Sequence, residues 1–363
     1  MPANIAHMLI CNKAVKILQE EGGEYRKFID LLDSKKYKPY LNLGALGPDL
    51  SYYGSQIKGL FNLIIKKTDK PLGVDGWSYF LHSKEPNQFP LILTELSRRD
   101  ADWEEQDWKD EDLPKFAFTC GYLSHVAADQ IIHPLVNEIA GPYYRKGKSR
   151  SLHRECEIYQ DVALFHILYE SESFMKRRFN RWADTAAHSH VNTEDWFRYF
   201  IQRAFAECHS AYPKEQNIEN WVDGLLSTLR IMKLPLSPYR KAHKEYKKSG
   251  LNGEKFKKYF SRYEDSFFDA VELTSIYWKA LFELYEPTNN ILEISDRMRK
   301  RFLKIVSNAD LSSPLEKNIL RKAKQALLST NDRRFKKLVA STKNPLKREK
   351  VTAIKQQDVG KVG

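Results

Sequence analysis

Three side chains that can ligate metal ions recur at four-residue intervals in GYLSHVAADQIIHP, residues 121–134. They are His125, Asp129 and His133. Residues four apart lie on the same face of an α-helix, and the segment around them is largely apolar. A buried carboxylate is costly unless it is paired or coordinates a metal ion. The spacing therefore predicts a metal-binding stripe on a buried helix that ends or kinks at Pro134.

A second pair of the same kind follows in LHRECEIYQD, where His153 and Glu157 are four residues apart and Asp161 lies one turn further on. Imidazole and carboxylate groups without a thiolate favour zinc in a catalytic rather than a structural role. The other histidines are predicted to be ordinary core or surface residues: His166, His188, His190, His209 and His243. The four cysteines are scattered, which predicts neither a disulfide framework nor a thiolate zinc site.

The elements that carry these residues are predicted to be helices. Apolar residues recur at three- and four-residue intervals in segments 5–20, 115–136, 152–170, 196–209, 263–285 and 315–329. Alternating runs of β-branched residues are scarce. Gly and Pro mark a turn at 44–49, a loop at 141–151 and a polar stretch at 234–254. This pattern predicts an all-α fold.

Composition indicates a globular protein with a basic end. Hydrophobic residues make up 42% of the 363 residues, which is enough to form a large core. The net charge is +12. Residues 331–363 contain ten Lys or Arg against three acidic residues, a net charge of +7. Such a tail can contact an anionic membrane or nucleic acid, or remain a solvated terminus.

The predicted organisation has three parts. Residues 1–240 form a helical domain, 241–330 form a helical C-terminal region, and 331–363 form the basic tail. The sequence shows no signal-peptide pattern and no apolar run of about 18 residues. We therefore expect a cytoplasmic protein, with peripheral membrane contact as an addition.

Five segments, in this order, resemble the zinc-dependent phospholipase C family, the all-helical bacterial enzymes with a three-zinc cluster. They are the first helix with His7, LGALGPDLSYY with Asp49, WSYFLHS with His82, the 121–134 segment, and the pair His153 and Glu157. The resemblance implies a multi-helix phospholipase C/nuclease-like bundle and covers roughly the first 160 residues. The chain from about Lys241 lies outside it.

The resemblance also implies the roles of the ligands. One zinc ion would be held by Asp49, His82, His125 and Asp129. A second would be held by His133, His153 and Glu157. Asp129 would bridge to a third, with His7 as a further ligand, so two or three ions are expected. Asp49 is also the candidate general base.

The resulting prediction is an enzyme, a zinc-dependent phosphodiester hydrolase. Its expected reaction is attack of zinc-activated water on the phosphorus of a phospholipid headgroup. An alternative is a zinc-dependent nuclease or phosphodiesterase that acts on nucleic acid or a soluble phosphodiester, since fungal single-strand nucleases use a similar cluster. A third, non-catalytic alternative is disfavoured because the ligand positions are intact. Fold and cluster do not fix the substrate.

Overall fold

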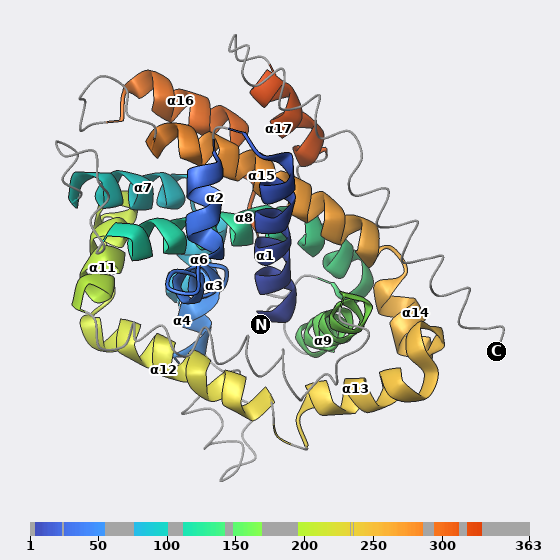
Figure 1. Ribbon diagram of the computed structural model, residues 1–363. Coiled ribbons are helices and arrows are strands. Elements are labelled where there is room, and N and C mark those ends of the chain that lie inside the picture. Colours follow the sequence, from blue (N-terminus) through green and yellow to red (C-terminus); the bar gives the residue numbers. More distant parts are fainter. Residues whose placement is uncertain are drawn as a thin grey trace.

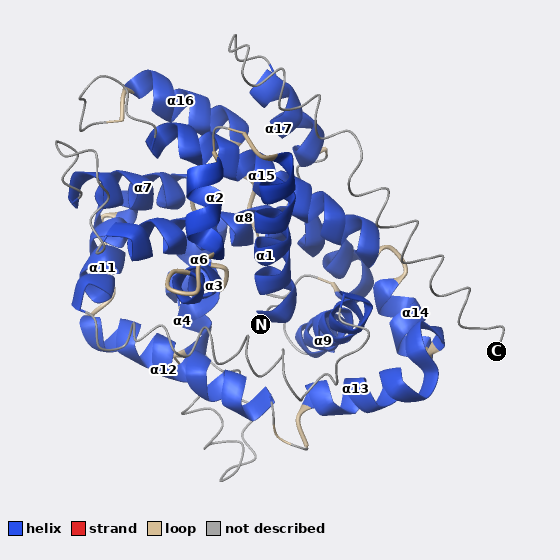
Figure 2. Cartoon of the chain, viewed as in Figure 1, coloured by secondary structure: helices blue, strands red, loops and turns tan. Residues whose placement is uncertain are grey.

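The computed structural model describes residues 4–23, 25–54, 76–100, 112–141, 148–168, 195–232, 234, 236–285, 294–311 and 318–328. These residues form helices, turns and loops, with no strand among them (Figure 2). The predicted all-α class is confirmed. The basic tail at 331–363 and the histidines at 188 and 190 lie outside the described residues.

Helix α8 (Asp112–Ala140) is the centre of the bundle, and Figure 1 shows the other helices arranged around it. Its apolar residues occupy every face, which is typical of a buried helix. Residues from Asp112 to Gln130 are all buried. Helix α8 packs against the following helices: α1 (Asn4–Glu21), α3 (Lys38–Gly44), α7 (Gln88–Asp100), α9 (Lys148–Leu168) and α15 (Tyr263–Tyr285).

Of the two predicted alternatives at Pro134, an end of the helix is wrong, because α8 continues through Pro134 to Ala140; a kink there stays a prediction. Proline removes one backbone hydrogen bond from a helix, but neighbouring helices bury the residues that follow it. Leu135, Val136 and Ala140 are all buried. Tertiary packing therefore maintains a turn that local propensity would end.

Two glycines bring the backbones of α3 and α8 into contact. A Cβ atom on Gly121 would lie 2.1 Å from the Leu41 carbonyl oxygen and 2.6 Å from the Ala45 nitrogen. A Cβ atom on Gly44 would lie 2.0 Å from the Phe118 carbonyl oxygen. Only glycine permits this approach. The chain then turns through the 3₁₀ helix η1 (Gly47–Asp49), as the Gly-Pro pattern predicts.

The remaining helices surround this centre (Figure 1). They are α2 (Arg26–Asp33), α4 (Leu50–Tyr53), α6 (Gly76–Ser83), α11 (Asp195–His209), α12 (Glu215–Met232), α13 (Pro238–Ser249), η4 (Gly250–Asn252), α14 (Glu254–Phe260), α16 (Asp296–Ile305) and α17 (Ile319–Leu328). Much of the polar stretch at 234–254 is helix α13, which the Ser237 side chain caps by accepting the Arg240 N–H. The division at residue 240 stays a prediction.

Candidate metal centre

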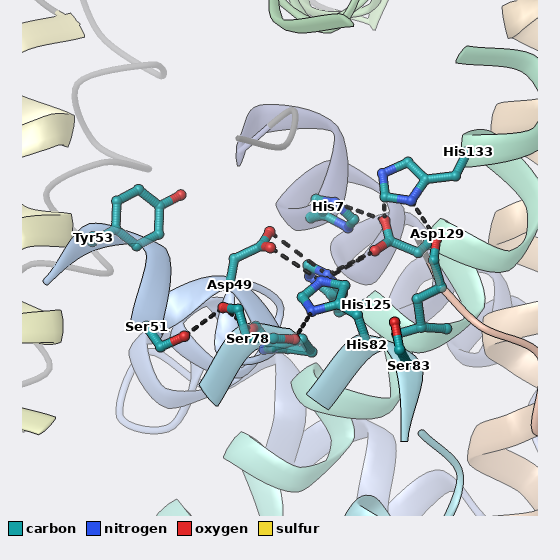
Figure 3. A network of polar contacts seen from close by, with 12 residues as sticks. His7, Asp49, Ser51, Tyr53, Ser78, His82, Ser83, His125, Asp129 and His133 are labelled. Carbon is teal, nitrogen blue, oxygen red and sulfur yellow. Dashed lines mark hydrogen bonds and ion pairs between the residues drawn. The ribbon is translucent and has the colours of Figure 1, made fainter. Parts of the chain in front are cut away.

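The structure brings all eight predicted ligands together in one buried site, and Figure 3 shows its central part. They come from five elements: His7 from α1, Asp49 from η1, His82 from α6, His125, Asp129 and His133 from α8, and His153 and Glu157 from α9. Each is at most 8% exposed. The roles of the individual residues stay predictions, but their convergence is a property of the fold.

Asp129 lies at the middle of the cluster. Its Oδ2 atom is 3.1 Å from His125 Nε2 and 3.6 Å from His82 Nε2. Its Oδ1 atom is 3.4 Å from His7 Nε2 and 3.5 Å from His133 Nε2. The two oxygens of one carboxylate therefore face two different pairs of imidazoles.

Two further carboxylates occupy the ends of the site. Asp49 lies 3.2 Å from His82 Nε2 through Oδ1 and 3.6 Å from His125 Nε2 through Oδ2. At the other end, Glu157 Oε1 lies 3.1 Å from His153 Nε2 and 3.7 Å from His133 Nε2.

The ligand atoms form three groups, each with its atoms within 4.8 Å of one another. The groups are His7, His125 and Asp129; Asp49, His82 and His125; and His133, His153 and Glu157. A bound ion fits each group, so the site can hold two or three ions.

Four of the five imidazoles are oriented by backbone carbonyl groups. Their Nδ1–H groups donate to the carbonyl oxygens of other residues: His82 to Ser78 (2.7 Å), His125 to Ala45 (2.9 Å), His133 to Leu311, and His153 to Gly141 (3.3 Å). Because a carbonyl can only accept, each Nδ1 carries a proton and each Nε2 is the ring atom that faces the site, where it offers a lone pair in the neutral imidazole. Histidines that bind metal ions are commonly oriented in this way, by a hydrogen bond from the ring nitrogen that does not face the metal.

His7 is positioned differently. Its ring stacks on that of His125 with centroids 3.9 Å apart, and its Nδ1 atom makes no hydrogen bond to a described residue. The first turn of α1 is instead held by Asp161, which accepts the N–H groups of Ile5 (3.2 Å) and Ala6 (2.8 Å) and the Tyr239 hydroxyl (2.7 Å). Asp161 thereby fixes the start of the helix that carries His7.

A segment far along the chain supports the same site. The N–H of Leu311 donates to the His82 carbonyl (2.8 Å), while its carbonyl accepts from the His133 ring. The segment 306–311 is held by Gln130, which donates to the Ser307 carbonyl (2.9 Å) and accepts from the Tyr277 hydroxyl (2.6 Å). The C-terminal region therefore contributes to the orientation of two predicted ligands.

The electrostatics favour the ligand forms of three of these groups, Asp129, Glu157 and His7. Burial opposes ionisation of Asp129, but the His133 and His125 imidazoles outweigh it and hold the pKa of Asp129 below its usual range. The pKa of Glu157 is likewise lowered against the effect of burial, by His153 and His133. Burial lowers the pKa of His7 to about 3, which keeps this imidazole neutral.

His133 has the opposite shift. Burial lowers its pKa, but Asp129 and Glu157 outweigh burial and raise it to about 9. A proton on His133 Nε2 must leave before that atom can bind an ion. Metal binding at this end of the site is therefore coupled to proton release.

Several buried atoms of the site lack a hydrogen-bond partner among the described residues. They include His125 Nε2, Asp49 Oδ2, Asp129 Oδ2 and Glu157 Oε2. Buried polar atoms are normally bonded, and unpaired buried carboxylates are costly unless a cation is near. All four belong to the three groups of ligands, so the donor set fits divalent ions bound by nitrogen and oxygen.

A family model described as zinc dependent phospholipase C matches residues 6–218. The chain belongs to this family, and is therefore a hydrolase of phosphodiester bonds that uses zinc. The matched residues include all eight predicted ligands. Neither the curated proteins nor the solved structures give a match to this chain. None of the described helices is long and apolar enough to span a bilayer.

Sequence reasoning missed the groups that orient the ligands. Asp161 was noted only for its spacing, and the carbonyls of Ala45 and Leu311 carry no side-chain signal. The histidines predicted to be ordinary, as far as they are described, take no part in the three groups. His166 and His243 instead bond to each other at 2.8 Å.

Proposed function

We propose that this enzyme is a phospholipase C that hydrolyses the phosphodiester bond between diacylglycerol and a phospholipid headgroup. The observation that carries the proposal is the convergence of eight buried nitrogen and oxygen ligands in a chain of this family. Bound zinc would neutralise the phosphodiester and lower the pKa of a bound water molecule.

The ligand distances support an assignment of each residue. Asp49, His82 and His125 would hold one ion, with Asp129 Oδ2 completing the set. His133, His153 and Glu157 would hold a second. Asp129 would act as the bridge, because its Oδ1 atom faces His7 and His133 on the other side.

Asp49 is the proposed general base. The residue is 1% exposed, and its Oδ2 atom lacks a hydrogen bond to the described residues. This oxygen is thus available to orient the attacking water and accept its proton. The two imidazoles beside Asp49 keep their Nε2 atoms directed at the same point, because their Nδ1–H groups are bound to backbone carbonyls.

A substrate panel tests the proposal. The zinc-loaded protein is incubated with phosphatidylcholine, phosphatidylethanolamine, single-stranded DNA and bis(p-nitrophenyl) phosphate, and mass spectrometry identifies the products. We expect diacylglycerol and a phosphorylated headgroup. Asp49→Asn should lower the rate by about 100-fold or more, the size of a general-base contribution.

Asp30→Asn is the matched control, since Asp30 is an exposed carboxylate on α2 that pairs with Arg26. Its rate should equal that of the unmodified protein. Cleavage of DNA without cleavage of lipid would replace the proposal with the nuclease alternative. Failure to cleave any substrate when zinc is fully bound would contradict the proposal.

A further inference from the structure

The connection between α12 and α13 exposes two leucines. Leu236 is 97% exposed and Leu234 is 53% exposed. The base of the connection is closed by a hydrogen bond from the Ser237 hydroxyl to the Met232 carbonyl (2.8 Å). Large apolar side chains that are exposed near each other on a protein surface often mark a site that contacts a protein partner or a membrane. We call this part of the connection, Leu234 and Leu236, the tip.

A basic surface follows directly. Residues 238–260 contain eight Lys or Arg and two acidic residues, a net charge of +6. Helix α13 directs Tyr239, Ala242 and His243 inward. The lysines on α13 are exposed, at positions 241, 244, 247 and 248. A buried inner face and a cationic outer face of α13 thus lie next to a connection that exposes two leucines.

This surface lies beside the metal centre. The Asn4 side chain donates to the Met232 sulfur (3.7 Å), and the Tyr239 hydroxyl donates to Asp161. Both contacts tie the connection to the first turn of α1, next to His7. Helices α13 and α14 also pack against α9, which carries two predicted ligands, and Figure 1 shows α13 below α9.

We propose that Leu234, Leu236 and the lysines of α13 form a docking surface for anionic lipid bilayers. The leucines insert between the headgroups, and the lysines bind anionic headgroups around them. Docking would place the metal centre close to the bilayer that contains its substrate. The inference rests on the proposed function, and the surface lies beyond the matched residues 6–218.

The exposed leucines favour a bilayer over nucleic acid. A nucleic-acid surface combines basic residues with aromatic side chains on which bases stack. The tip here presents aliphatic side chains, which gain most from leaving water for hydrocarbon. The charge pattern alone suits either ligand, so the leucines decide between them.

Vesicle sedimentation tests the docking surface in the chain of 363 residues. Vesicles of phosphatidylcholine, with and without phosphatidylserine, are sedimented on ice at low and high salt. We expect stronger binding with phosphatidylserine and weaker binding at high salt. Lys241→Glu with Lys244→Glu should weaken partitioning by about tenfold or more. Leu234→Ser with Leu236→Ser should weaken it by about tenfold even at low salt.

Two matched controls accompany these variants. Arg297→Glu with Lys300→Glu makes the same charge change at exposed positions of α16, at the opposite end of the molecule in Figure 1. Leu234→Ile with Leu236→Ile keeps the apolar surface. Both should bind as the unmodified protein does. Circular dichroism checks that every variant keeps its helical content.

Some results would overturn the docking proposal. One such result is that all variants bind vesicles equally well. Another is that the protein binds single-stranded DNA tightly and that only the lysine variant loses this binding. The phospholipase proposal fails separately, because hydrolysis is measured apart from sedimentation. Vesicle binding without hydrolysis contradicts the phospholipase alone. Hydrolysis of bis(p-nitrophenyl) phosphate without vesicle binding contradicts docking alone.

Discussion

Substitution of Gly121 by alanine should damage the metal centre from outside it. The new Cβ atom would lie 2.1 Å from the Leu41 carbonyl oxygen, 2.6 Å from the Ala45 nitrogen and 2.8 Å from the Gly44 Cα. All three are backbone atoms, so no side chain can rotate away. Restoring ordinary contact requires α3 and α8 to separate by about 1 Å.

The separation should lower both the free energy of unfolding and the affinity for metal. Overpacking of this kind destabilises a protein by about 1–3 kcal/mol, and alanine recovers up to about 1 kcal/mol of helix propensity. We expect a net loss of about 1–2 kcal/mol in the free energy of unfolding. The bond from His125 Nδ1 to the Ala45 carbonyl, 2.9 Å long, would lengthen to about 4 Å and break. Loss of a hydrogen-bond partner that orients a ligand imidazole typically weakens metal affinity by about 10- to 100-fold.

Urea unfolding and zinc competition against a chromophoric chelator measure the two effects. Gly224→Ala is the matched control, because its Cβ atom would lie 2.1 Å from the Tyr53 carbonyl oxygen, which orients no ligand imidazole. It should cost similar stability with a smaller loss of zinc affinity. A Gly121→Ala protein that is destabilised but binds zinc normally would refute the role of the Ala45 carbonyl.

Three further predictions concern the support of the site and of α9. Gln130→Leu should cost about 1–3 kcal/mol and weaken zinc binding, because it removes the bond to the Ser307 carbonyl and the acceptor of the Tyr277 hydroxyl, which loosens segment 306–311. Unaltered urea unfolding would contradict this. Asp161→Asn should cost more stability than Tyr239→Phe, because it changes the acceptor of three hydrogen bonds, whereas Tyr239→Phe removes only one of their donors. Equal losses of stability would contradict this. Burial lowers the pKa values of His166 and His243 to about 4. The folded state then binds fewer protons than the unfolded state, so stability should fall as pH falls from about 6.5 to 4. Between these pH values His166→Phe should lose less free energy of unfolding than the unmodified protein does, as measured by urea titrations at each pH.

The helices and the stripe on α8 could be predicted from the sequence because both depend on local spacing. His7, Asp49 and His82 have no such spacing, and only the family resemblance pointed to them; their role as ligands stays a prediction. Helix α15 begins and ends where its periodicity predicts, at Tyr263 and Tyr285. The His125, Asp129 and His133 stripe lies on one face of α8 because residues four apart must do so. Local spacing is insufficient at Pro134, where packing from other helices decides whether a helix continues.

The orientation of the ligands could not be read from the sequence. The carbonyls of Ala45 and Leu311 bind ligand imidazoles across 80 and 178 residues of chain. Backbone groups have no residue type, so no pattern identifies which carbonyl will meet which ring. The close approach of Gly44 and Gly121 is likewise a contact between distant segments, and the glycines alone do not reveal their partner.

Zinc content is the most direct test of the account. Inductively coupled plasma mass spectrometry on the purified chain should find two or three zinc ions per chain. Asp129→Ala should remove at least one of them, because both oxygens of that carboxylate face imidazoles. Asp30→Asn should keep them all. A folded protein that contains no zinc, and takes up none when zinc is supplied, would contradict the metal centre and the reaction proposed for it.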